Sequence, residues 1–514
     1  PEYSSAASDV YKRQALFFVS FNLSSEIKQL NFLYTNDLHA HLQPHIEQWI
    51  SKTRPVGGFA NLATLIKEEK STNPNTLYID AGDYFSGPYI STLTEGEAVI
   101  DTMNLLGVDA ACIGNHEFDH GWESMLDKFE MATFPIVNGN IFYEGTDELI
   151  WDNPYVILES NGLKIGVIGL HGKFAFYDTT NFKMVDGLEA RDEEYYLRKY
   201  IEELEPITDL IVLSVHEGVP GRQSTKGLSD VERTLSKDID LAKNVPGVDI
   251  MITGHAHKGT PDALLSNETI IVSTNAYSIE LGKLVVSYDT EKNKIVDYSN
   301  ELITIFDDEI EDDPEMSKVI DYWESQVQKI ALKEVSFTTD KMVRAYGEES
   351  NMGNLFADAA EEYDKKIDFA VINSGALRQD LDPGVLTKGD LISAFPFPNT
   401  LVMTKITGAQ IEGLFNHAAG MTNGVLQVSK SFKYVIDSNG EIKELRLNGK
   451  PINRKKTYWV ASTNFVTLGG DGYWEFTESI EYEDTNIFIV DVVEDYLKDK
   501  PRYSPVYEER IVIE

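Results

Sequence analysis

The sequence predicts a two-domain α/β protein, and three observations support this. The chain has 514 residues, more than a single hydrophobic core usually organises. From Leu30 to about Asp289, short β-branched runs alternate with helical patterns, as they do in layered α/β domains. From about Val335 to the end, helical and strand patterns alternate again, separated by Gly-rich turns. We therefore expect one α/β domain in each half.

The segment 307–334 separates these two halves and has the pattern of a helix. It starts with a run of acidic residues and has Pro314 near a plausible helix start. Its apolar residues then recur at helical spacing: Met316, Val319, Ile320, Trp323, Val327 and Ile330. We interpret it as a connecting helix between domains 26–306 and 335–514; the alternative is a surface helix of one domain.

Composition excludes some classes of protein. Acidic residues number 84 and basic residues 45, which gives a net charge of −39. A protein that binds the nucleic-acid backbone needs a basic surface, so we expect no nucleic-acid partner. No run of about 18 apolar residues is present, so no transmembrane segment is expected. The acidity fits a solvated surface. If the substrate is an anion, cationic side chains near the site must overcome the repulsion from the net negative charge.

The N-terminus and the cysteine content bear on the compartment. Residues 15–25, ALFFVSFNLSS, form an apolar run of signal-peptide size that ends in small residues. Residues 1–14 lack the expected Met and basic start, and we interpret them as an assembly artefact preceding a truncated signal peptide; the alternative is a natural disordered arm. The mature protein would then start near Ser25 and be exported, to the periplasm or outside the cell. Cys112 is the only cysteine, so no intrachain disulfide is possible, and we expect it to be buried.

Five stretches share one pattern, in which an apolar strand is followed at once by metal-ligand residues. They are LNFLYTNDLHAH (30–41), TLYIDAGDYFSG (76–87), AACIGNHEFDHG (110–121), DLIVLSVHEG (209–218) and DIMITGHAHKG (249–259). In α/β sheets, sites form beyond the carboxyl ends of the strands, where several loops converge. We therefore expect these loops to meet in space.

The residue types in these loops favour a pair of divalent metal ions. Asp, Asn and His without a thiolate suit Zn, Mn, Fe or Co. One tetrahedral shell is too small for the candidates, which are Asp37, His39, Asp83, Asn115, His216, His255 and His257. Alone, each motif has a plainer interpretation: D-x-H is more often a turn or cap, and a lone His216 is more often a core residue. Five such motifs in order favour two ions that share a carboxylate, an arrangement suited to phosphoryl transfer.

These motifs resemble the calcineurin-like metallophosphatase superfamily and, within it, the 5′-nucleotidase family. A second set of motifs resembles that family's nucleotide-binding C-terminal domain: SNMGNLFADA (350–359), NSGALR (373–378), FPFPNTL (395–401) and TNFVTLGGDGY (463–473). The resemblance covers nearly everything from about Lys28 onward. It implies an N-terminal β-sandwich flanked by helices, a connecting helix and a C-terminal α/β domain.

The resemblance also implies roles for single residues at the metal centre. Asp37, His39 and His257 would hold the first ion, and Asp83 would bridge to the second. The ligand set of the second ion would be completed by Asn115, His216 and His255. His116 would face the phosphate as a cation or proton donor, with Asp119 orienting its ring. A carboxylate partner favours the protonated imidazole, which is the useful form beside developing negative charge.

In the C-terminal half, the resemblance implies a nucleotide pocket. Arg378 would bind phosphate beside Asn373, and Arg344 is a candidate second phosphate ligand whose spacing departs from the family pattern. Phe397 and Phe465 would sandwich the base, because aromatic faces bind any base. Asp471 would bind the ribose hydroxyls. Pro398 and the NSGALR loop depart from some relatives, so substrate choice is less determined than the metal chemistry.

The sequence therefore predicts an exported phosphohydrolase that releases phosphate from nucleoside 5′-monophosphates. The hypothesis is in-line attack on the phosphate by a hydroxide that bridges the two ions. Alternatives on the same scaffold are a 2′,3′-cyclic-nucleotide 2′-phosphodiesterase with 3′-nucleotidase activity and a UDP-sugar hydrolase. A thiol-ester hydrolase of sulfur oxidation is a further alternative. An exported nucleotide-binding protein with a vestigial site is the alternative from another class.

Overall fold

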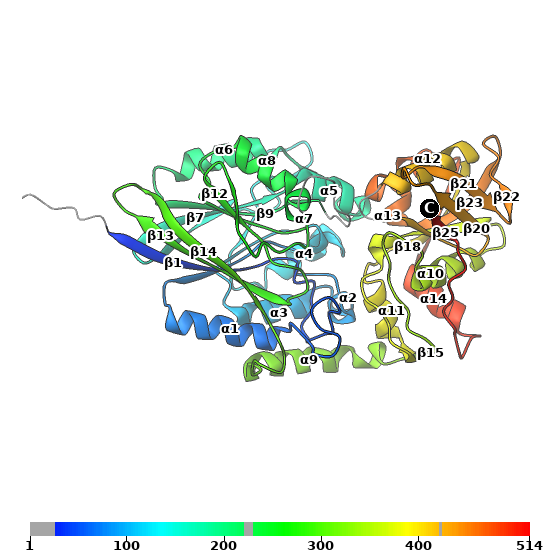
Figure 1. The fold of residues 1–514 in the computed structure, drawn as a ribbon, viewed down its shortest axis with the longest axis horizontal. Coiled ribbons are helices and arrows are strands. Elements are labelled where there is room, and N and C mark those ends of the chain that lie inside the picture. The colour runs from blue at the N-terminus through cyan, green and yellow to red at the C-terminus, as the bar shows by residue number, and fades with distance from the viewer. Residues whose placement is uncertain (1–25, 220–229, 421–423) are drawn as a thin grey trace, which may run out of the picture.

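The chain folds into two α/β parts joined by a single long helix. The structure, a computed structural model, describes residues 26–219, 230–420 and 424–514. The first part lies on the left in Figure 1 and the second on the right, with the helix α9 (Pro314–Ala331) running beneath the first towards the second. The expected artefact and signal peptide, residues 1–25, lie outside the described residues.

The N-terminal part contains two sheets of six strands each. Their strand orders are β14-β13-β1-β2-β3-β4 and β11-β12-β10-β9-β7-β6. The first sheet consists of β1 (Ile27–Thr35), β2 (Thr76–Asp80), β3 (Ala110–Cys112), β4 (Ile136–Val137), β13 (Glu280–Asp289) and β14 (Lys294–Thr304). The second consists of β6 (Tyr155–Ser160), β7 (Leu163–His171), β9 (Leu210–His216), β10 (Ile250–Thr253), β11 (Leu264–Ser266) and β12 (Thr269–Val272).

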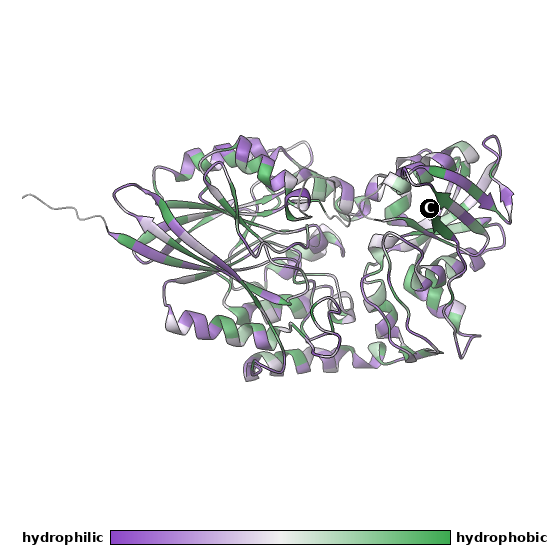
Figure 2. Ribbon diagram, viewed as in Figure 1, coloured by the Kyte–Doolittle hydropathy of each residue, from purple (hydrophilic) through white to green (hydrophobic). Residues whose placement is uncertain are grey.

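The two sheets pack face to face, and helices cover their outer faces. Alternate residues of β1, such as Phe32 and Tyr34, enter a core shared with Val167 and Val212 of the second sheet. Their neighbour Leu33 points the other way, into the core under α1 (Phe59–Thr72) and α3 (Glu97–Leu106). The outer face of the second sheet packs on α6 (Glu193–Leu204) and α8 (Ser236–Asn244). This is the expected four-layer sandwich, and Figure 2 shows hydrophobic stretches along its central strands.

Parallel pairing brings the strand ends of each sheet together. β1, β2, β3 and β4 run parallel, and so do β7, β9, β10 and β12. Every residue of β2 and β9 is buried, which agrees with their continuous apolar runs. Because both sets end at the same side of the sandwich, the loops that follow them converge there.

The connecting helix forms where its sequence pattern predicts it. The Asp313 carboxylate caps the N-terminus by accepting from the backbone N–H groups of Glu315 and Met316, and Pro314 occupies the first turn. Met316, Ile320 and Val327 of the predicted stripe are buried against the first part. Ile330, the last residue of that stripe, is 52% exposed because α9 extends beyond the first domain's core there.

The C-terminal part is built on a mixed five-stranded sheet with the order β19-β16-β23-β18-β24. Its strands are β16 (Phe369–Asn373), β18 (Thr400–Thr407), β19 (Leu426–Val428), β23 (Thr457–Thr463) and β24 (Glu481–Phe488). One face packs on α10 (Asn351–Glu362), α11 (Lys388–Ala394) and α14 (Ile489–Leu497). The other face packs on α12 (Gly408–Gly420) and on a small sheet of β20 (Phe432–Ile436), β21 (Ile442–Leu447), β22 (Lys450–Pro451) and β25 (Ile511–Ile513).

Two expectations from composition can be compared with the structure. Within the described ranges, no helix is long and apolar enough to cross a membrane. Cys112 on β3 is fully buried in the core between the two sheets, as its apolar surroundings predict.

Candidate metal centre and adjoining cavity

All seven predicted ligands lie at the carboxyl ends of the parallel strands. Two groups of ligand atoms form there, each with its atoms within 4.8 Å of one another: Asp37, His39, Asp83 and His257 in the first, and Asp83, His216 and His255 in the second. Asn115 joins the second group, since its Oδ1 lies 3.2 Å from His216 Nε2. Asp83 belongs to both groups, as a bridging carboxylate must.

The loops that carry these ligands are strained. Five of the seven ligands have left-handed backbone conformations, with φ of 52° for Asp37, 46° for His39, 59° for Asp83, 70° for His255 and 52° for His257. Such conformations cost about 1–3 kcal/mol per residue and persist where the surroundings over-determine them, commonly at functional sites. Here the buried Glu117 carboxylate helps, because it accepts backbone N–H groups from Asp83, Phe85 and Gly114.

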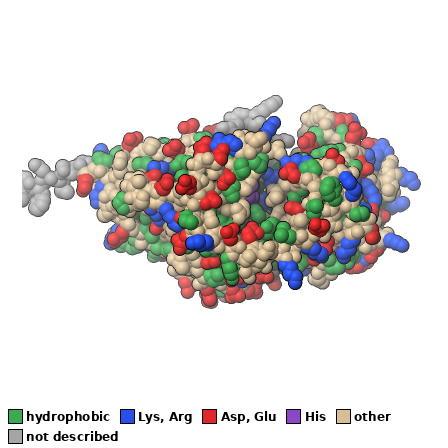
Figure 3. Space-filling view, turned by 90° about the horizontal axis from the view of Figure 1, so that it is seen from below, with side chains coloured by type: hydrophobic (Ala, Val, Ile, Leu, Met, Phe, Trp, Pro, Cys, Tyr) green, Lys and Arg blue, Asp and Glu red, His purple; other side chains and the backbone are tan. Residues whose placement is uncertain are grey.

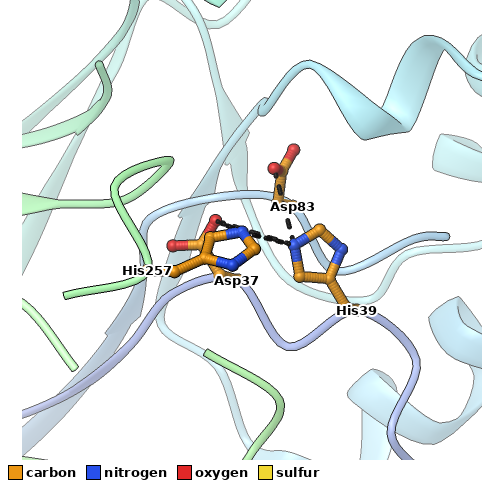
Figure 4. Close-up of side chains that lie close together, drawn as sticks. All are labelled: Asp37, His39, Asp83 and His257. Carbon is orange, nitrogen blue, oxygen red and sulfur yellow. Dashed lines mark hydrogen bonds and ion pairs between the residues drawn. The ribbon is translucent and has the colours of Figure 1, made fainter. Parts of the chain in front are cut away.

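In the first group, two imidazole nitrogens face each other (Figure 4). His39 Nε2 lies 2.9 Å from His257 Nε2, and His257 Nε2 lies 3.4 Å from Asp37 Oδ1. His39 Nδ1 lies 2.8 Å from the carbonyl of Ser86, which accepts its hydrogen and leaves Nε2 with a lone pair. Burial lowers the pKa of His39 well below its usual value, so this imidazole is neutral.

The second group has buried polar atoms with no hydrogen-bond partner. Among the described residues, Asp83 Oδ2, His255 Nε2 and Asn115 Nδ2 make no hydrogen bond. His216 directs Nδ1 to the carbonyl of Ala81, at 2.8 Å, and Nε2 towards Asp83 Oδ2, at 3.0 Å. A buried lone pair that faces a carboxylate is costly unless a cation lies between them.

These observations fit a pair of divalent ions. Imidazoles, two of them with the second nitrogen held by a carbonyl, together with two aspartates and an amide, are the donor set of Zn, Mn, Fe or Co, and two groups that share one carboxylate could hold two ions. The unpartnered lone pairs of Asp83 Oδ2 and His255 Nε2 are what such ions would satisfy. The residues present therefore fit the implied metal pair.

His116 is placed beside the metal ligands and outside both groups. Its Nδ1 lies 2.8 Å from Asp119 Oδ2, and its Nε2 lies 4.0 Å from Asp83 Oδ2. Burial lowers the pKa of His116, but the Asp119 and Asp83 carboxylates outweigh burial and raise the pKa above its usual value. The protonated ring is therefore favoured, as the family resemblance implies.

A cavity of about 330 Å³ connects the metal centre with the C-terminal part. It is large enough for a small ligand, and a histidine side chain is visible in the hollow between the two parts (Figure 3). All six residues predicted to bind substrate line it: Arg344, Asn373, Arg378, Phe397, Phe465 and Asp471. The cavity therefore places a nucleotide-sized space against the predicted metal ligands.

Several predicted substrate residues already contact the metal side. Arg378 Nη2 lies 3.2 Å from His116 Nε2, and the Phe397 ring stacks on His116 with centroids 5.3 Å apart. Arg378 Nε is buried and has no partner among the described residues, as expected for a guanidinium that awaits an anion. Asn373 Nδ2 donates to Asp471 Oδ2 at 2.9 Å.

Arg344 has a different setting from Arg378. Its Nη1 donates to the backbone carbonyl of Arg378, and its side chain lies 4.0 Å from Glu47 and 3.9 Å from Asp380. It therefore contributes positive charge to the cavity wall while it is partly neutralised by two carboxylates. Together the two arginines provide the local cations that an acidic protein needs for an anionic substrate.

The sequence interpretation missed residues that act through packing. Asn36 ties the first ligand loop to the turn after β12, because its Oδ1 accepts from Thr274 N, at 2.7 Å, and its Nδ2 donates to Asp37 Oδ2, also at 2.7 Å. Tyr277, in the same turn, and Asn181 line the cavity. An asparagine directly before the first ligand was a usable signal for Asn36; nothing in the sequence pointed to Tyr277 or Asn181.

Comparison with known proteins agrees with this arrangement. The family model of calcineurin-like phosphoesterases matches residues 30–259, and that of the 5′-nucleotidase C-terminal domain matches residues 330–478. A trifunctional nucleotide phosphoesterase of Bacillus subtilis is 29% identical over 94% of this chain, which spans 35% of that protein's length. A snake venom 5′-nucleotidase from Naja atra is 27% identical over 94% of this chain and 98% of its own length.

A solved structure shares the whole architecture. The 5′-nucleotidase precursor of Thermus thermophilus superposes with a TM-score of 0.84 at 24% identity, covering 95% of this chain and 99% of the other. Both domain models, the ligand groups and the shared architecture point the same way. The chain belongs to the 5′-nucleotidase family of calcineurin-like metallophosphatases and is a metal-dependent phosphoester hydrolase.

Proposed function

We propose that this enzyme releases phosphate from nucleoside 5′-monophosphates at a centre of two divalent ions. The observation that carries the proposal is the cavity that joins the two ligand groups to Arg378, Phe397 and Phe465. A phosphate at the metals and a base between the two phenylalanines would fill its two ends. Nucleotide phosphoesterases among the relatives support the substrate class.

The seven ligands would hold the ions in the two groups described above, with Asp83 shared. When bound, the ions supply an activated water and neutralise charge on the phosphoryl group. His116 donates a hydrogen bond or a proton to the phosphoryl oxygens, and Asp119 keeps its ring oriented and charged. Catalysis is then mainly positioning and electrostatic stabilisation.

The C-terminal part binds the rest of the nucleotide. Arg378 holds the phosphate, for which a planar guanidinium is suited, and Arg344 adds positive charge behind it. Phe397 and Phe465 stack on the base. Asn373 and Asp471, which hydrogen-bond each other, face the ribose and base edge.

We also propose that the two parts rotate relative to each other about the end of α9. Beside the stacking of Phe397 on His116, several direct contacts between the parts are single polar pairs: Asn181 Nδ2 to Asn399 Oδ1 at 3.1 Å, Lys183 Nζ to Asp484 Oδ2 at 2.5 Å, and Thr92 Oγ1 to the Pro396 carbonyl at 2.8 Å. Such contacts are easily exchanged for water, so opening to admit substrate has a small cost.

A substrate panel tests the proposal. Phosphate release is measured from AMP, 3′-AMP, 2′,3′-cyclic AMP, ATP and UDP-glucose, with Mn, Zn and Co added separately. The proposal expects the highest kcat/KM for AMP. A preference for 2′,3′-cyclic AMP with 3′-AMP, or for UDP-glucose, would instead support one of the two alternative activities. Nucleotide binding without turnover of any compound would contradict an enzymatic role.

Export to the periplasm or the outside is a further part of the proposal and rests on the apolar run 15–25. N-terminal sequencing of secreted protein tests it, with a start near Ser25 expected. A mature start upstream of Ala15 would contradict it.

A further inference from the structure

Asn399 lies beside the two phenylalanines proposed to stack on the base. It follows Phe397 by two residues, on the loop that leads into β18. The next residue, Thr400, and Phe465 both donate their backbone N–H groups to Asn464 Oδ1, at 3.2 and 2.9 Å. This shared acceptor ties the loop of Phe397 to the loop of Phe465. Asn399 thus forms part of the cavity wall where the two loops meet, and it is 6% exposed.

A segment of the N-terminal part reaches the same wall. It begins with α5 (Lys173–Thr179), which lies towards the C-terminal part in Figure 1 and packs against the turn Gly470–Gly472. Beyond α5, the ring of Phe182 lies 6.1 Å from that of Trp474, measured between centroids. Asn181 stands between these two contacts, is buried and lines the cavity. The segment therefore places an N-terminal side chain in the proposed base pocket.

Hydrogen bonds fix which way the two amide groups face. The backbone N–H of Lys183 donates to Asn181 Oδ1 at 3.1 Å, so the amino end of Asn181 faces the other way. That end, Nδ2, donates to Asn399 Oδ1 at 3.1 Å. A carboxamide has one oxygen and one amino group. Asn399 therefore turns its oxygen to Asn181, and its Nδ2 donates to no described residue.

We propose that Asn399, oriented by Asn181, determines base specificity by donating a hydrogen bond from Nδ2 to a carbonyl oxygen on the nucleobase. The inference rests on the base-stacking role proposed for Phe397 and Phe465. Stacking alone does not distinguish one base edge from another. An amide donor does, because a keto oxygen accepts its hydrogen, whereas an amino group at that position would leave two donors facing each other. The preferred purine substrates are then 6-oxopurine nucleotides over 6-aminopurine nucleotides.

Inosine 5′-monophosphate (IMP) and AMP are the probes, since their bases differ only along the edge that carries C6 and N1. Phosphate release by the metal-loaded full chain gives kcat/KM for each nucleotide. One hydrogen bond gained by the first and lost by the second predicts kcat/KM about tenfold higher for IMP. Calorimetric titration with inosine and adenosine gives a second readout that does not depend on turnover, and inosine should bind more tightly.

Two substitutions should each reverse the preference. Asn399→Asp still accepts from Asn181 but presents an oxygen where the amino group was. Asn181→Asp still accepts from Lys183, and its second oxygen accepts from Asn399. The unchanged Asn399 amide must then turn over and present its own oxygen to the base. Both variants are expected to prefer AMP, because an acceptor now faces its amino group.

Asn293→Asp is the matched control. Asn293 is exposed in the turn between β13 and β14 and has a φ of 50°, a conformation that aspartate also tolerates. The substitution adds the same negative charge outside the cavity, so the ratio of kcat/KM for IMP to that for AMP should equal that of the wild type. Melting temperatures of all variants show whether each is folded.

The outcomes separate this inference from the proposed function. Equal kcat/KM for IMP and AMP in the wild type, or a preference for AMP, would refute the inference while the function stands. A fall in kcat/KM that is equal for both nucleotides in the folded Asn399→Asp and Asn181→Asp variants would show that the pair only joins the two parts, and would refute the inference as well. If the wild type releases phosphate from neither nucleotide, the proposed function fails, and the binding of inosine and adenosine decides the inference.

Discussion

Neighbouring residues in the AACIGNHEFDHG stretch have different roles at the site. Asn115 faces the second ligand group, while His116 faces the cavity and Arg378. Glu117 turns inward and holds three backbone N–H groups of the ligand loops. The three residues differ in role because the short 3-10 turn at 116–118 directs successive side chains about 120° apart.

His116→Ala is expected to lower kcat by about 100- to 10,000-fold, the usual range for a lost acid–base group. Metal content should remain that of the wild type, because His116 belongs to neither ligand group. Steady-state kinetics and elemental analysis of the same preparation provide the test. Loss of metal together with activity would make His116 a ligand and contradict the assignment.

The sequence allowed the candidate ligands, which the structure brings together, to be singled out because each follows a buried strand and has a side chain with few other uses there. Tyr277 and Asn181 escaped this reasoning. Their places in the cavity depend on how turns more than 100 residues apart in sequence pack together, and tyrosine and asparagine are common in ordinary turns. The local sequence does not determine such contacts.

At the scale of elements, close approach between loops shapes the metal centre. A Cβ on Gly114 would lie 2.3 Å from Asp83 Oδ1 and 2.4 Å from Asp83 N. The loop after β3 can therefore contact the loop after β2 only where it has no side chain.

Gly114→Ala is consequently expected to displace Asp83, to cost about 1–3 kcal/mol by overpacking, and to weaken binding of both ions. Thermal denaturation and metal content measure the two effects. Gly420→Ala is the control, since its Cβ would have no described atom within 4 Å. Equal metal content in Gly114→Ala and the control would contradict the expectation.

The start of β10 provides a test of pH dependence. The carboxylate of Asp249 accepts from the Ile211 backbone N–H at 2.8 Å, and burial raises its pKa to about 6. The folded state thus holds this proton more tightly than the unfolded state, so Asp249 stabilises below its unfolded pKa and this contribution is lost as pH rises to about 6.

Between pH 4 and 6, the stability of the wild type relative to Asp249→Asn should fall, by at most about 1.4 kcal/mol per pH unit. Asparagine retains the acceptor for Ile211 and does not titrate. Urea denaturation of both proteins at several pH values provides the measurement. Parallel pH profiles would show that Asp249 titrates alike in the folded and unfolded states.

The sequence patterns predicted the helices and strands that have a strong hydrophobic periodicity. They predicted short strands that pair over long sequence distances less well. The connecting helix was predicted from its acidic start, Pro314 and its apolar stripe, although it begins seven residues and ends three residues inside the predicted segment. The small sheet β20–β21–β22–β25 of the C-terminal part was not resolved as a separate unit. Its β25 comes from the chain's last residues, and such long-range pairing leaves no local signature.

At the scale of the whole molecule, the site is assembled from both ends of the chain. Its candidate metal ligands begin at Asp37, and its cavity wall extends to Asp471. The metal ions would bind only the N-terminal part, whereas the substrate would contact both parts.

Removal of the ions by a strong chelator is expected to abolish phosphate release and to lower the melting temperature, because ligands of the folded state stabilise it by mass action. Far-UV circular dichroism should show that the fold persists at room temperature. Activity should return when Mn, Zn or Co is added back. Full activity in protein shown by elemental analysis to be metal-free would contradict the assignment of the ligand groups.

The acidic exterior affects how fast substrate arrives. The two cavity arginines, Arg344 and Arg378, are enclosed within a protein of net charge −39. At low ionic strength an approaching anion experiences repulsion from the whole surface before it experiences the attraction of the cleft. Dissolved salt shortens the reach of that repulsion to about 8 Å at 0.15 M. Salt screens the attraction of the enclosed guanidinium groups much less, because they are buried. Encounter with a nucleotide should therefore become faster as salt is added, the reverse of the behaviour of enzymes whose exterior steers anions inward.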